Sequence, residues 1–129
     1  MTSEAFIEFT NTHSKARLTE HEREKIIELA DKLSDDLRQK IADDITFDWG
    51  GILARQPLTL KSLMQFLRVE LLQIVNEKAK KTKLTGAPRD WIPYEQNRYL
   101  IAYYWKQEIK KLPEWARNLS FSDSEKDRV

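Results

Sequence analysis

The chain has very few residues that interrupt helices. It contains only three glycines and four prolines among 129 residues, well below the usual share. All-β folds need frequent turns, which glycine and proline commonly supply. The scarcity therefore disfavours an all-β fold and leaves long stretches in which apolar residues can follow a helical period.

The first such stretch begins at a sequence that is typical of a helix start. Thr19 is followed three residues later by Glu22, the spacing of a capping box that satisfies unpaired backbone N–H groups. Apolar residues then recur in steps of 4, 3, 4 and 4, which places them on one helical face. The pattern predicts a helix over about 20–44, kinked near Ser34. Its apolar stripe consists of Ile26, Ala30, Leu33, Leu37 and Ile41.

Two more helices are predicted further along the chain. Thr59 is a candidate N-cap for a helix that ends in the cations around Lys81, which suit the negative end of a helix dipole. This helix is apolar on more than one side, so we expect it to be central. Its expected core residues are Leu63, Leu67, Leu71 and Ile74. Pro93 suits the first position of a third helix.

These elements predict an all-α fold, a single-domain helical bundle of three main helices with short flanking helices. The domain covers 1–119, with a short lead-in over 1–18, and the polar segment 120–129 is expected to be a disordered tail. Between the first two helices, Gly50 or Gly51 should have a positive φ, and Trp49 should fill the core beside that turn.

Sequence motifs of catalysis and of cofactor binding are missing. The chain has no cysteine, no glycine-rich phosphate loop and only His13 and His21 as imidazole groups. Asp43, Asp44 and Asp48 form a small acidic cluster that could hold Mg²⁺, meet a basic partner or lie exposed near a helix end. We predict a protein that is not an enzyme, with no catalytic residues, no cofactor and no metal.

Charge is distributed unevenly along the chain. Residues 1–56 carry 8 Lys/Arg against 12 Asp/Glu, a net charge of −4, whereas residues 57–119 carry 12 against 6, a net charge of +6. The basic part also holds most of the large aromatic residues. A cationic, aromatic surface can meet phosphates, bases or an acidic protein.

The predicted binding residues come from this basic part. Tyr103, Tyr104 and Trp105 are consecutive, so they cannot all face one side of a helix. At least one of the three should lie off the buried stripe. The predicted set for binding a partner or nucleic acid is Lys78, Lys80, Lys81, Lys83, Arg89, Trp91, Arg98, Tyr99, Lys106, Lys110 and Lys111.

The sequence thus indicates a non-catalytic helical interaction protein. We expect a small subunit or adaptor of a larger protein or nucleoprotein assembly, which docks through charge-complementary faces. The alternative is direct DNA or RNA binding by the basic aromatic segment 78–111, although the near-neutral total charge weakens this alternative. Absence of cysteine, of a signal peptide and of a long apolar run predicts a cytoplasmic protein without a membrane span, and specifies no oligomeric state.

Overall fold

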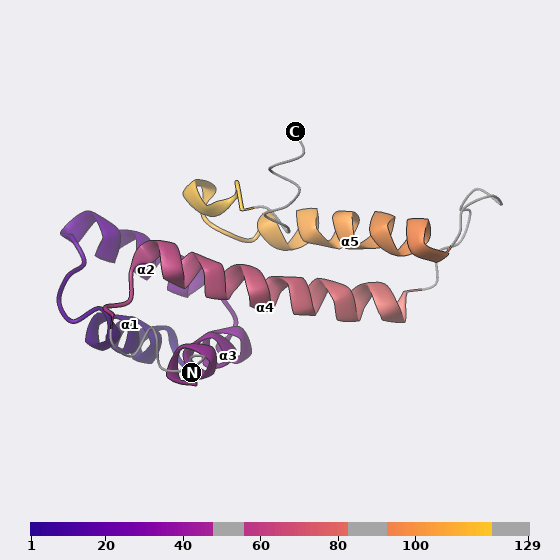
Figure 1. The fold of residues 1–129 in the computed structure, drawn as a ribbon. Coiled ribbons are helices and arrows are strands. Elements are labelled where there is room, and N and C mark those ends of the chain that lie inside the picture. Colours follow the sequence, from indigo (N-terminus) through magenta and orange to yellow (C-terminus); the bar gives the residue numbers. More distant parts are fainter. Residues whose placement is uncertain (48–55, 83–92, 120–129) are drawn as a thin grey trace. The chain divides into compact units, whose positions relative to one another are not determined.

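The structure is a computed structural model, and it describes residues 1–47, 56–82 and 93–119. These residues form helices joined by turns and contain no strand, which confirms the all-α class (Figure 1). The predictions for Trp49, for Gly50 and Gly51, and for the tail 120–129 lie outside the described residues.

The chain divides into two compact units, Met1–Glu70 and Leu71–Val129. The first unit has 10 Lys/Arg and 13 Asp/Glu, and the second has 12 and 8, so their net charges are −3 and +4. Unit 1 is therefore acidic and unit 2 basic. The single domain over 1–119 stays a prediction.

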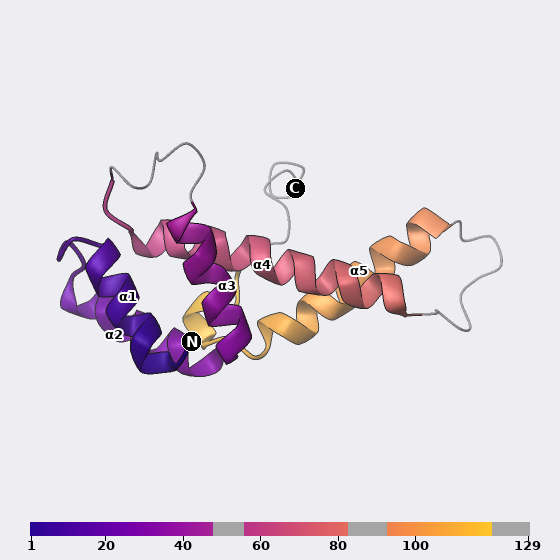
Figure 2. The same cartoon turned by 90° about the horizontal axis from the view of Figure 1, so that it is seen from below.

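Unit 1 contains α1 (Ser3–His13), α2 (Glu20–Lys32), α3 (Asp35–Thr46) and the first half of α4 (Leu60–Lys81). Helix α1 contacts both α2 and α3 (Figure 2). Apolar residues from all of these helices are almost completely buried, and burial of their side chains stabilises the unit. They include Phe6, Ile26, Leu29, Ile41, Leu63 and Leu67.

The predicted helix over 20–44 is in fact two helices. The capping box at its start is confirmed, because Thr19 Oγ1 accepts from the Glu22 N–H at 3.1 Å and Glu22 Oε1 accepts from the Thr19 N–H at 3.0 Å. Leu33 is extended, with φ −96° and ψ 151°. Ser34 then caps α3 by accepting from the Leu37 N–H at 3.1 Å. The kink predicted near Ser34 is therefore a complete break, although the apolar stripe continues through it. Three main helices are not confirmed.

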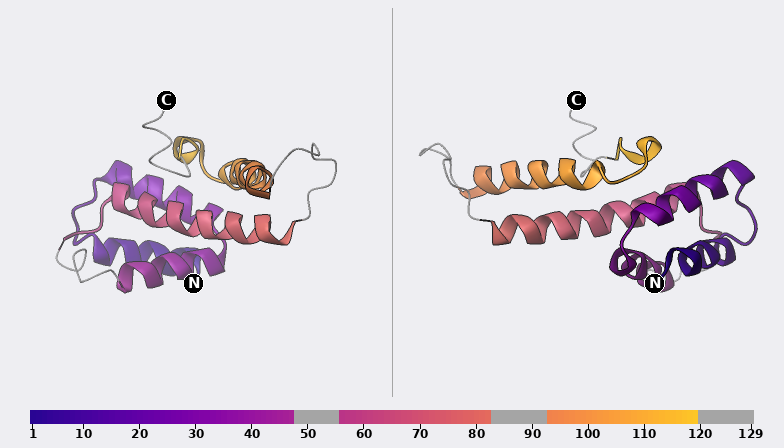
Figure 3. Two further views of the ribbon diagram at one scale, coloured as in Figure 1. Left: turned by 45° about the vertical axis from the view of Figure 1, so that its right-hand side comes forward. Right: turned by 180° about the vertical axis from the view of Figure 1, so that it is seen from behind.

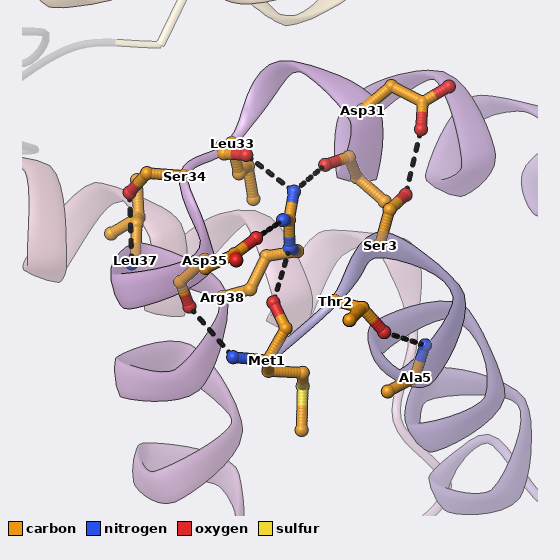
Figure 4. Close-up of polar contacts among 11 residues, drawn as sticks. Met1, Thr2, Ser3, Ala5, Asp31, Leu33, Ser34, Asp35, Leu37 and Arg38 are labelled. Atoms are coloured by element: carbon orange, nitrogen blue, oxygen red, sulfur yellow. Dashed lines mark hydrogen bonds and ion pairs between the residues drawn. The ribbon is translucent and has the colours of Figure 1, made fainter.

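Arg38 holds the corner between these two helices together (Figure 4). Its side chain is buried, and it donates to the carbonyl oxygens of Met1 at 2.9 Å and Ala30 at 2.6 Å. It also donates to the Leu33 carbonyl and pairs with Asp35. The buried guanidinium thereby links the N-terminus, the end of α2 and the start of α3, and its own donors are satisfied, as buried polar groups require.

Helix α4 begins after Thr59, whose hydroxyl accepts from the Ser62 N–H at 3.0 Å. The predicted burial of Leu63, Leu67 and Leu71 is confirmed, whereas Ile74 is only half-buried. Beyond Leu71 the buried residues follow steps of four, to Val75 and Ala79. Ile74 lies to one side of that line, which is why its expected burial is incomplete.

In unit 2, α5 (Pro93–Ile109) lies antiparallel to the second half of α4 (Figures 1 and 3). Two side-chain contacts fix this arrangement: Lys78 meets Glu108, and Thr82 meets Tyr104. Pro93 is the first residue of α5, as predicted. The short 3-10 helix η3 (Glu114–Ala116) follows.

Among the described helices, none combines the length and the apolar character that a membrane crossing requires.

Candidate interaction surface

Two of the predicted binding cations contact a buried carboxylate of their own unit. Lys78 Nζ donates to Glu108 Oε1 at 2.6 Å, and Lys111 Nζ lies 3.4 Å from the same oxygen. Burial alone would raise the pKa of Glu108, but the hydrogen bond from Lys78 and the positive charge of Lys111 lower it below its ordinary value. Glu108 is therefore ionised and offsets much of the charge that Lys78 and Lys111 bring.

The remaining predicted cations are distributed over several places. Lys80 and Lys81 lie exposed in the last turn of α4, and Lys80 is 3.8 Å from Glu77. Arg98 is exposed on α5. Lys83, Arg89 and Trp91 lie outside the described residues, so their part in the predicted binding set stays a prediction.

Four other residues of the predicted region share one face of α5. Tyr99, Tyr103, Lys106 and Lys110 follow each other in steps of 4, 3 and 4, and all four are exposed. Residues with this spacing lie in one row along a helix. The two tyrosines are 49% and 48% exposed, which is high for aromatic side chains in a folded unit. We call this row the α5 stripe.

The face of α5 opposite the α5 stripe is the one that contacts other residues of unit 2. Tyr104 Oη and Thr82 Oγ1 are 2.6 Å apart, and Trp105 Nε1 donates to the Leu119 carbonyl at 3.1 Å. Trp105 is 4% exposed, so it lies in the core of the unit. Tyr103 touches the edge of Tyr104 but is itself exposed. This confirms that one aromatic residue of the consecutive three lies off the buried stripe.

In unit 1 the two described members of the predicted acidic cluster have different surroundings. Asp43 is exposed and accepts from Gln39 Nε2 at 2.9 Å. Asp44 is half-buried and shares a hydrogen bond with Glu70 of α4. Asp48 lies outside the described residues. No group of three or more His, Asp or Glu side chains converges as metal ligands within the part of the chain that the structure describes.

Glu70 is a buried carboxyl that the sequence analysis missed. The residue is 5% exposed, and it lies between the core residues Leu67 and Leu71. Burial, the hydrogen bond with Asp44 and the negative charge of Asp44 together raise its pKa to about 7, while the positive charge of Lys40 acts in the opposite direction. The available signal was its position, since an acid three residues after Leu67 falls on an otherwise apolar stripe.

A cleft of about 380 Å³ lies in unit 1 where α2 and α4 begin, and its charged lining residues are Arg17 and Glu22. The Glu22 carboxylate already accepts the Thr19 N–H in the capping box, and its hydrogen bonding to Thr19 lowers its pKa. Its carboxylate therefore acts as a helix cap.

Comparison of the chain with protein families, curated proteins and solved structures gives no match. The chemistry of the exposed side chains is therefore the basis on which a function can be inferred.

Proposed function

We propose that this chain is a non-catalytic helical interaction protein, a small subunit or adaptor, which docks on an acidic protein surface through the α5 stripe. The observation that carries the proposal is the exposure of Tyr99 and Tyr103 beside Lys106 and Lys110 on one helical face. Tyrosine is enriched among the residues that dominate binding energy at protein interfaces, where its ring is buried and its hydroxyl finds a partner.

The charge around the α5 stripe supports an acidic partner. Unit 2 has a net charge of +4, and a positive field accelerates association with a negative surface. The exposed Lys80, Lys81 and Arg98 contribute to this field, as would Lys83 and Arg89. In this proposal they steer the encounter, whereas the α5 stripe makes the contact.

Two candidate acid–base groups in the described residues, His13 and Glu22, have structural uses, which supports a non-catalytic role. His13 Nδ1 is 2.9 Å from the Phe9 carbonyl oxygen, and its ring stacks on the Phe9 ring. Glu22 caps α2. Glu70 has the kind of perturbed pKa that active sites often show, but it lies within the packed face of α4 and does not line the cleft in unit 1.

The proposal can be tested by purifying the tagged full chain from the cells that make it and identifying what co-purifies. The native chain is compared with Y99A/Y103A and with the control F47A, which removes an aromatic side chain that is 78% exposed at the C-cap of α3. We expect a protein recovered in stoichiometric amount with the native chain and with F47A. Recovery should fall at least about tenfold with Y99A/Y103A.

A nuclease-treated sample separates the two classes of partner. Exposed tyrosines beside lysines can also stack on bases, so recovery that nuclease abolishes would favour direct nucleic-acid binding instead. Equal recovery of the same proteins by the native chain and by Y99A/Y103A would contradict the proposal in both forms.

A further inference from the structure

Helix α2 carries an exposed row with the same spacing as the α5 stripe. Glu20, Glu24, Ile27 and Asp31 follow in steps of 4, 3 and 4, and all four are exposed. Ile27 is 45% exposed, which leaves an apolar side chain between carboxylates. We call this row the α2 stripe. It lies away from the buried face of α2, which carries Ile26, Leu29 and Ala30.

The two stripes complement each other when the helices run antiparallel. The spacing reads the same in both directions, so four residues can face four. Glu20 and Glu24 then face Lys110 and Lys106, and Ile27 faces Tyr103. Asp31 faces Tyr99, whose hydroxyl can donate to its carboxylate. Asp31 already accepts from Ser3 Oγ at 2.8 Å, but a carboxylate has about four lone-pair sites and can accept further bonds.

The parallel arrangement is less complementary. It places Glu20 and Glu24 against the two tyrosines and Ile27 against Lys106, so that only Asp31 faces a cation. Antiparallel helices also align their dipoles favourably. Charge and apolar matching therefore select the antiparallel register.

We propose that the α5 stripe of one copy of this chain docks antiparallel on the α2 stripe of a second copy. This inference rests on the proposed function, because it takes the α5 stripe as the docking surface and names its acidic partner. Unit 1 of the second copy supplies that acidic surface, with a net charge of −3 against +4 for the unit that docks on it.

The contact joins two different surfaces, which determines what assembly it makes. A contact of this kind closes into a ring where the rotation between copies allows and otherwise extends into an open chain. One helix pair buries less than a standard interface of about 1,600 Å². We expect self-association on the order of micromolar, and weaker in high salt because exposed charges are screened.

Sedimentation velocity of the purified full chain tests the proposal through a charge swap. The native protein should associate with rising concentration at about 50 mM salt and dissociate at about 500 mM. K106E/K110E and E20K/E24K should each be monomeric, because each double substitution places like charges opposite each other across the contact. The control K15E/K61E makes the same charge change as K106E/K110E, but at exposed sites outside both stripes. It should associate like the native chain.

An equimolar mixture of K106E/K110E with E20K/E24K should associate again. In that mixture the native α5 stripe of one variant meets the native α2 stripe of the other, and the two reversed stripes are complementary. Restoration by mixing shows that both variants are folded and that opposite charges across the contact are required. Circular dichroism of each variant checks its helix content directly.

Engineered disulfides test the register, since the chain has no cysteine of its own. I27C mixed with Y103C should oxidise to a mixed dimer at least about tenfold faster than I27C mixed with F47C, whose cysteine lies outside the α5 stripe. Equal rates for the two mixtures would overturn the antiparallel contact.

A native chain that is monomeric at every concentration and salt, or a mixture that fails to associate, would overturn the self-association. The proposed function would then still stand if Y99A/Y103A lost a different co-purified protein that F47A retained. These outcomes distinguish a failure of the self-association from a failure of the proposed function.

Discussion

Each unit buries a glutamate, and the two glutamates behave in opposite ways. Glu70 in unit 1 is 5% exposed and Glu108 in unit 2 is 8% exposed. Glu70 meets Asp44, and its pKa is raised to about 7. Glu108 meets Lys78 and Lys111, and its pKa is lowered.

The contrast shows that burial does not by itself decide the ionisation of a carboxyl. Loss of hydration raises the pKa of both groups, and the sign of the neighbouring charge decides the outcome. In the acidic unit the buried glutamate keeps its proton until near neutral pH. In the basic unit it ionises and is held by two lysines. The two units should therefore respond oppositely to pH.

The largest expected effect is on the pH dependence of folding stability that Glu70 confers. Because its pKa is higher in the folded chain than in the unfolded chain, its stabilising contribution is fully present below pH 4.5 and is lost as the pH rises through about 7. E70Q cannot ionise, so it should be more stable than the native chain above pH 8, by up to about 3 kcal/mol. The two should be nearly equal below pH 5.

Urea unfolding of both proteins at several pH values measures this difference. E77Q is the matched control, because Glu77 lies exposed on the same helix, and it should show no such trend. Parallel profiles for E70Q and the native chain would mean that the buried carboxyl does not titrate near neutral pH.

E108Q should change the stability of the chain in the opposite direction from E70Q. The substitution removes the acceptor charge that holds Lys78, so we expect a loss of about 1–2 kcal/mol near pH 7. The loss is moderate because the Lys78 side chain is 44% exposed and can be hydrated again. The pKa of Glu108 is lowered in the folded chain, so its contribution is present above the ordinary value of 4.5 and disappears as the pH falls through the lowered value.

Unfolding of E108Q in urea at pH 7 and at pH 3 checks this. E114Q serves as the control, because Glu114 is exposed in η3. A deficit of E108Q that is constant with pH would indicate a packing defect rather than the loss of an ion pair.

D44N should have a smaller effect, and it acts through Glu70. The substitution removes a negative charge beside Glu70, so the pKa of Glu70 should fall toward its ordinary value. We expect about 1 kcal/mol of added stability above pH 8. An NMR titration of the Glu70 carboxyl carbon measures the shift directly. D43N changes an exposed neighbour and should leave the Glu70 titration where it is.

The sequence was sufficient to locate most helix starts. Thr19, Thr59 and Pro93 each mark a start that the structure confirms, because caps and proline act on residues within one turn. The kink predicted near Ser34 is a complete break between two helices, and the sequence did not show its extent because the apolar stripe continues across it. Arg38 was missed as well, since the carbonyl oxygens that hold it belong partly to Met1, 37 residues away.

The candidate surface was predictable only in part. Spacing alone places Tyr99, Tyr103 and Lys106 on one face of a helix. Both faces of α5 carry aromatic residues, so the buried face is identified by contacts from outside the helix, such as those of Thr82 and Leu119. Glu108 and Glu70 depend in the same way on partners far along the chain.

The smallest expected effect separates the two lysines that contact Glu108. Lys78 Nζ is 2.6 Å from Glu108 Oε1, whereas Lys111 Nζ is 3.4 Å from it and its side chain is 63% exposed. An exposed ion pair with loose geometry contributes little. K111Q should therefore cost at most about 0.5 kcal/mol at pH 7, and K78Q about 1 kcal/mol because it removes the short charged hydrogen bond.

A double-mutant cycle with E108Q assigns these costs to the pairs, because it subtracts effects that each side chain has on its own. The coupling of Glu108 with Lys78 should exceed its coupling with Lys111, and raising the salt concentration should reduce the Lys111 coupling more. Equal couplings would show that Glu108 senses the general positive charge of unit 2. The contrast with Glu70 would then depend on the charge of each unit as a whole rather than on one hydrogen bond.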